Sequence, residues 1–177
     1  MTGIEYVWIV IVALFGIVGI VRTYPRELGV TTMCVAALLL LLQFGEKILS
    51  LLQGGLGTES TWLASPRFEA SFFIIIFLAV VFISYQGITL TFKGQPPKGP
   101  VSPILGLLVG LLNGYIVGGT VWSYLHRYAY PFGLIEGGRL SDLAKRIIEI
   151  LPPQLFDPKP GYLLGLLLLL LILSVWR

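Results

Sequence analysis

Metal or cofactor chemistry would have to rest on one histidine and one cysteine, because the sequence contains only His126 and Cys34. His126 stands near the end of a long apolar segment, where an imidazole nitrogen could ligate a haem iron or a chlorophyll magnesium. The sequence has no second histidine to complete a paired site. A single cysteine forms neither an internal disulfide nor a thiolate cluster. We therefore expect no metal and no cofactor, with His126 bound to headgroups or water and Cys34 packed as a small buried residue.

Catalytic groups are equally sparse. The sequence shows no Ser, His and Asp set that converges plausibly, no metal-ligand spacing and no glycine-rich phosphate loop. We also expect every charged residue to lie outside the apolar segments, which leaves no material for the proton relays and ion sites of pumps. The prediction is a chain without catalytic residues, which is not an enzyme and does not transport a solute by itself.

The composition predicts a membrane protein. Hydrophobic residues make up 56% of the 177 residues, charged residues only 12%, and the mean hydropathy is +0.89. An ordinary soluble domain has about 25% charged residues. The apolar residues come in blocks, and a helix needs about 18 or more of them to cross a hydrocarbon layer of ~30 Å. We expect an all-α integral membrane protein with four to five transmembrane helices and one amphipathic interfacial helix.

These elements form a single membrane domain over residues 1–177. The expected spans are 6–21, 28–44, 70–92, 103–125 and 162–176. The first is expected to be retained, because no signal-peptide pattern precedes it. The fifth is short for a bilayer at ~1.5 Å per residue, so a re-entrant helix is the alternative there. Residues 46–53 either extend the second span or form a separate surface helix.

The interfacial helix is expected over residues 140–151. Its apolar residues recur at helical spacing and comprise Leu140, Leu143, Ala144, Ile147, Ile148 and Leu151. Charged residues fill the opposite face, Ser141 or Asp142 can cap the start, and Pro152 stops the helix. Such a helix lies flat at the headgroup boundary or docks onto the other helices, and both readings stay open.

The distribution of charge indicates an orientation. The net charge is +3, but no cluster of basic and aromatic residues indicates nucleic-acid binding. With the amino terminus outside, the cytoplasmic side receives Arg22, Arg26, Lys93, Lys98 and Arg177, opposed only by Glu27. This is the pattern of the positive-inside rule. We expect the amino terminus outside and the carboxyl terminus inside, with Arg22, Arg26, Lys93 and Lys98 as lipid and topology anchors.

Glycines recur at four-residue intervals in the fourth span. They are Gly106, Gly110, Gly114 and Gly118. Small residues at this interval let another backbone approach closely, which matters because lipid gives helices no hydrophobic drive to associate. We expect a helix-packing face here. Its partner is either the first span, which contains Gly16 and Gly19, or another subunit.

Two short motifs flank the first apolar span. They are Gly3-Ile4-Glu5-Tyr6 before it and Arg22-Thr23-Tyr24-Pro25-Arg26-Glu27-Leu28 after it. Together they resemble the start of the colicin V production protein (CvpA-like) family. The family shows an acidic residue before its first span and an Arg-Gly-Phe-x-Arg-Glu turn after it, so Thr23 stands where the family has glycine. The glycine-spaced fourth span is also similar, and the resemblance covers about residues 4–151. It implies a bacterial inner-membrane protein linked to export or envelope homeostasis, and it assigns no catalytic residue.

Three functions remain open. The first is a non-catalytic scaffold or accessory protein of the bacterial inner membrane that acts through helix packing and lipid contact. The second is a small structural subunit of a respiratory or photosynthetic membrane complex, and the third is a component of an export channel. The expected partners are the lipid bilayer and other membrane subunits or a second copy, without nucleic acid.

Overall fold

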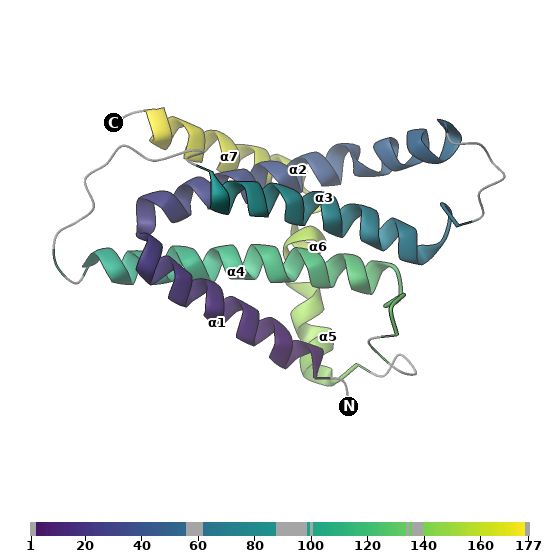
Figure 1. The fold of residues 1–177 in the computed structure, drawn as a ribbon, viewed down its shortest axis with the longest axis horizontal. Coiled ribbons are helices and arrows are strands. Elements are labelled where there is room, and N and C mark those ends of the chain that lie inside the picture. Colours follow the sequence, from purple (N-terminus) through teal and green to yellow (C-terminus); the bar gives the residue numbers. More distant parts are fainter. Residues whose placement is uncertain are drawn as a thin grey trace.

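The chain is all-α, as predicted, and membrane-embedded. The computed structural model describes residues 3–55, 62–87, 99, 101–133, 135 and 140–175. The helices in this part of the chain are α1 (Ile4–Arg22), α2 (Tyr24–Gly55), α3 (Pro66–Gln86), α4 (Val101–Arg127), α5 (Asp142–Glu149), α6 (Pro152–Phe156) and α7 (Pro160–Val175) (Figure 1). Helices α1 to α4 are each long and apolar enough to cross a membrane.

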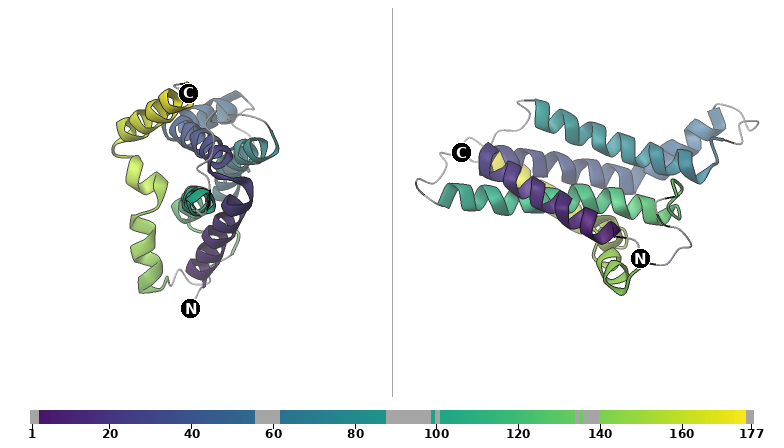
Figure 2. Two further views of the ribbon diagram at one scale, coloured as in Figure 1. Left: turned by 90° about the vertical axis from the view of Figure 1, so that its left-hand side faces the viewer. Right: turned by 60° about the horizontal axis from the view of Figure 1, so that its bottom comes forward.

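The four long helices alternate in direction. Helix α1 runs toward the turn at Thr23, α2 runs back, and α3 and α4 repeat the alternation (Figure 1). We call the end that contains Thr23 the turn end. We call the opposite end, where α1 begins and α5 and α6 run across the bundle, the crossing end. Viewed along the bundle, α4 lies in the centre and the other helices surround it (Figure 2).

Helix α2 is much longer than the predicted second span, because it starts at Tyr24 and continues to Gly55. Residues 46–53 therefore extend the second span, which is one of the two predicted alternatives, and they do not form a separate surface helix. The apolar block of α3 ends at Gln86, and residues 88–92 of the predicted span lie outside the described residues. Helix α7 is a shorter apolar helix that packs against α2 and buries Leu163 and Leu170.

The amphipathic segment is docked rather than free. The Ser141 hydroxyl accepts a hydrogen bond from the Ala144 backbone N–H and so caps α5. The apolar face of α5 packs with Trp122 of α4, while Leu143 remains exposed on the other side. The Tyr115 hydroxyl of α4 donates to the Ile150 carbonyl. These contacts fix the short connection from α5 to α6 against the bundle.

The main core lies between α2, α3, α4 and α7. The Phe73 ring of α3 stacks on the Tyr124 ring of α4 with the ring centroids 4.7 Å apart. Cys34 of α2 is fully buried in the same core, which is the packing role expected for it. Large apolar side chains fill this region, and small ones fill the contact between α1 and α4.

Glycines allow α1 and α4 to touch along their backbones. A Cβ atom added to Gly19 would lie 2.1 Å from the Gly106 carbonyl oxygen, and one added to Gly106 would lie 2.3 Å from the Gly19 oxygen. A Cβ on Gly110 would lie 2.4 Å from the Phe15 oxygen. Further along α4, Gly114 faces Val12 of α1 in the same way. The first span is therefore the partner of the glycine face.

Gly19→Ala is expected to destabilise the protein by about 1–3 kcal/mol, the usual range for overpacking. The clash is with backbone atoms of α4, which cannot rotate away, so α1 and α4 must separate. The measurement is unfolding in detergent micelles followed by circular dichroism.

Gly165→Ala is the matched control, because a Cβ there meets no atom within 4 Å. Alanine also favours a helix over glycine. We expect this variant to be as stable as the parent or slightly more stable. Equal stability of the Gly19→Ala and Gly165→Ala variants would contradict the close contact.

Candidate functional site: a buried carboxylate at the α1–α2 turn

The turn between α1 and α2 is a single residue in an unusual backbone conformation. Thr23 has φ 74° and ψ 148°, a region that residues with a Cβ rarely adopt. Its N–H donates to the Gly19 carbonyl and so closes α1. Pro25 lies in the first turn of α2, where a missing N–H costs no helical hydrogen bond. The sharp reversal brings Arg22 and Glu27 together although they belong to different helices.

Glu27 is the centre of the site, and its side chain is fully buried. The Arg22 Nε donates to Oε1 of Glu27 at 3.0 Å. The Tyr85 hydroxyl donates to Oε2 at 3.0 Å, and the Asn113 Nδ2 donates to the same oxygen at 2.8 Å. Donors from α1, α3 and α4 thus converge on one carboxylate of α2.

The partners of Glu27 also bind one another. The Arg22 Nη1 donates to the Tyr85 backbone carbonyl at 3.0 Å, and the Arg22 guanidinium lies 4.8 Å from the centre of the Tyr85 ring. The Asn113 side chain is fully buried, and its Oδ1 accepts from the Thr31 hydroxyl at 2.7 Å. Each of these buried polar groups has a partner, as burial without water requires. We call these five residues, Arg22, Glu27, Thr31, Tyr85 and Asn113, the Glu27 cluster.

The prediction that every charged residue lies outside the spans is wrong for Glu27. Hydropathy placed the start of the second span at residue 28, but α2 begins at Tyr24 and the neighbouring helices cover its first turn. Arg22, predicted as a lipid anchor, contacts Glu27 and Tyr85 instead. Asn113, the one amide in a glycine-rich apolar helix, was the signal that could have indicated a buried polar site.

A second carboxylate is buried at the crossing end. Glu5 is only 4% exposed, and its Oε1 accepts from the Ser141 hydroxyl at 2.7 Å. Ser141 at the same time caps α5, so this contact joins the first turn of α1 to the start of the docked helix. In the sequence, Glu5 was indicated only by the family resemblance, as the acidic residue before the first span.

The remaining predicted residues are spread over the structure. His126 lies half-buried near the end of α4, with its ring centre 5.7 Å from that of Tyr130. In the described ranges, no group of three His, Cys, Asp or Glu side chains could hold a metal. Arg26 is exposed at the turn end, as a lipid anchor would be, and Lys93 and Lys98 lie outside the described residues. Gly118 lies farther along the glycine face, beside the Trp8 ring.

Glu27→Gln is expected to destabilise the protein by about 3 kcal/mol, because loss of one member of a buried pair leaves an uncompensated charge. The amide keeps the size of the side chain, but its NH₂ group would face donors, and Arg22 would lose its counter-charge. Unfolding in detergent micelles measures the change.

Glu46→Gln provides the control, since Glu46 is also a glutamate of α2 paired with an arginine at 3.0 Å. Its side chain is 57% exposed, so the pair contributes less than about 1 kcal/mol. The expected result is a clearly larger loss for Glu27→Gln. Similar losses for both variants would mean that the Glu27 cluster does not stabilise the fold.

Thr23→Gly is expected to stabilise the protein by about 1 kcal/mol, because glycine relieves the backbone strain of the turn. This net gain already allows for the greater conformational entropy that glycine loses on folding. Gln43→Gly, at an exposed helical position of α2, should instead cost about 1 kcal/mol. The two variants can be compared in one unfolding experiment, and a loss of stability in both would contradict the strained turn.

Comparison with known proteins found no matching family model, no similar curated protein and no similar solved structure. The resemblance to the colicin V production protein family therefore stays a prediction.

Proposed function

We propose that the chain is a non-catalytic scaffold or accessory protein of the bacterial inner membrane, as its resemblance to the colicin V production family implies. The observation that carries the proposal is the Glu27 cluster. Its polar groups hydrogen-bond to one another, and these bonds join α1, α2, α3 and α4 at one point. A site of this kind holds helices in place.

A proton-relay role for Glu27 would need a different arrangement. A relay carboxylate exchanges its proton with water or another carrier, so one of its oxygens must be free to do so. Both side-chain oxygens of Glu27 already accept hydrogen bonds from Arg22, Tyr85 and Asn113. This supports a structural role for the carboxylate.

Exposed apolar faces supply the contact surface of a scaffold. On α1 the outward residues recur at helical spacing and include Val7, Val10, Leu14, Ile17 and Val21. On α7 most of the leucines are exposed, and the helix packs mainly on α2. In a membrane such faces contact lipid tails or other transmembrane helices.

The orientation that we propose has the amino terminus outside and the carboxyl terminus inside. Arg22 and Arg26 lie at the turn end, where α3 also ends and α4 begins, and Lys93 and Lys98 stand between α3 and α4 in the sequence. Lys and Arg near the membrane favour the cytoplasmic side. The crossing end, with Glu5 and α5, would then face outward.

Labelling with a membrane-impermeant maleimide in intact bacterial cells tests this orientation. Cys34 is fully buried and adds little background. Lys145→Cys on exposed α5 should react in intact cells, whereas Arg26→Cys should react only after the membrane is opened. The reverse order of labelling would reject the orientation.

Mild detergent extraction followed by native mass measurement tests the scaffold proposal itself. A monomer or small homo-oligomer without pigment or haem is the expected result. A discrete large complex that contains pigment or haem would instead identify a structural subunit of an energy-converting complex. A ring that conducts ions in liposomes would identify an export channel component.

A further inference from the structure

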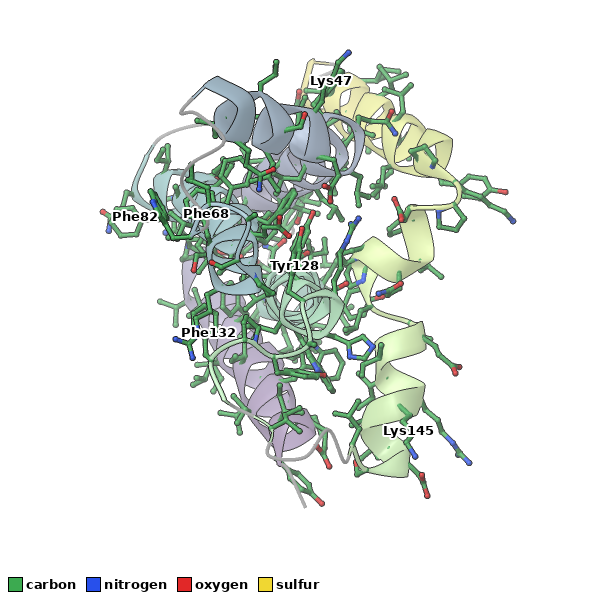
Figure 3. The ribbon with its side chains drawn as sticks, turned by 90° about the vertical axis from the view of Figure 1, so that its right-hand side faces the viewer. Lys47, Phe68, Phe82, Tyr128, Phe132 and Lys145 are labelled. Atoms are coloured by element: carbon green, nitrogen blue, oxygen red, sulfur yellow. The ribbon has the colours of Figure 1, made fainter. Side chains whose placement is uncertain are left out.

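A pocket of about 280 Å³ lies between α2, α4 and α6. Its walls include Ser123 and Tyr124 of α4 and Gln154 of α6, and two charged residues, Arg127 and Asp157, also line it. Figure 3 looks at the molecule from the crossing end, with Tyr128 labelled just beyond α4 and with α6 beside it. The Glu27 cluster does not contribute to this pocket.

The pocket lies at the depth of one membrane surface. At ~1.5 Å per residue, Glu46 is about 28 Å along α2 from Glu27, which is close to the ~30 Å thickness of a hydrocarbon layer. Glu46 pairs with Arg127, the last residue of α4. With the start of α2 at Tyr24 near one boundary, the pocket therefore faces the headgroups of the other.

The pocket offers charges of both signs. The Arg127 Nη2 lies 3.0 Å from Oε1 of Glu46 in an ion pair, but the Arg127 side chain is 45% exposed, and a guanidinium has five N–H donors. Asp157 follows α6 and is exposed. A ligand that carries an anion and a cation a few atoms apart would match this arrangement, whereas a purely anionic ligand would lie against carboxylates.

Two hydroxyl-bearing residues of α4 also line the pocket. Ser123 and Tyr124 are 3% and 2% exposed as whole residues. Within the described part of the chain, neither side chain donates a hydrogen bond. Their hydroxyls are therefore free to donate to an acceptor that a ligand in the pocket supplies. Phosphate oxygens are strong acceptors of this kind.

We propose that this pocket binds the phosphoethanolamine headgroup of a membrane phospholipid. The phosphate accepts hydrogen bonds from Arg127 and from the Ser123 and Tyr124 hydroxyls, and the ammonium donates to Asp157. Leu42 gives the pocket an apolar wall on the side of the membrane interior, where the lipid tails continue. The ligand is a lipid of the outer leaflet in the orientation proposed above, although the binding site itself does not depend on that orientation.

Native mass spectrometry of the delipidated protein tests the proposal. Phosphatidylethanolamine, phosphatidylcholine and phosphatidylglycerol with identical acyl chains are added in equal amounts. We expect about tenfold preferential retention of phosphatidylethanolamine over phosphatidylcholine, because choline has no N–H to donate to the Asp157 carboxylate. Arg127→Gln should lower the retention of phosphatidylethanolamine about tenfold. Asp157→Asn should abolish the preference for phosphatidylethanolamine over phosphatidylglycerol.

Asp142→Asn is the matched control, because this carboxylate is exposed like that of Asp157 but lies on α5, away from the pocket. It should leave lipid retention unchanged. Circular dichroism checks that the Arg127→Gln variant is folded, as expected for an exposed ion pair. Equal retention of phosphatidylethanolamine and phosphatidylcholine, or unchanged retention in folded Arg127→Gln, would overturn the proposal. Displacement of the lipid by an equal concentration of free phosphoethanolamine would show that the ligand is a soluble molecule instead.

Discussion

Hydrocarbon cannot donate or accept a hydrogen bond, and this constraint explains the Glu27 cluster. Every polar group that leaves the membrane surface must find its partner in the chain. The Glu27 carboxylate meets this demand with donors from three other helices. Because these donors lie on α1, α3 and α4, satisfying one buried group also sets the relative positions of four helices. The strained residue Thr23 is the local cost of bringing Arg22 to that carboxylate.

Two kinds of contact hold the bundle, and they act on different helices. Helices α1 and α4 approach through glycines, so the attraction between them comes from close backbone packing. Helices α2, α3 and α4 meet through large side chains, such as the stacked rings of Phe73 and Tyr124. Close backbone contact needs a smooth surface, whereas side-chain packing tolerates variation in shape. The central helix α4 presents a glycine face to α1 and a face of larger residues to the core.

The sequence predicted the features that depend on local patterns. Apolar blocks indicated the long helices, and the spacing of Ala144, Ile147 and Ile148 indicated an amphipathic helix. The four-residue glycine interval indicated a packing face but not its partner. The Glu27 cluster escaped prediction because Tyr85 and Asn113 are 58 and 86 residues away from Glu27 along the chain. A single glutamate at the edge of an apolar block has the same local pattern whether it faces lipid headgroups or three other helices.

The four residues that separate Arg22 from Glu27 bear on how the protein enters the membrane. The two charges lie within one helical hairpin, so the first two helices to be synthesised contain both members of the ion pair. Helices form before they associate in a bilayer, and a paired charge is less costly to hold at depth than a lone one. Tyr85 and Asn113 are synthesised later and complete an ion pair that the amino-terminal hairpin can form without them. Insertion and final assembly are thus separate events, and the arrival of α4 marks the second.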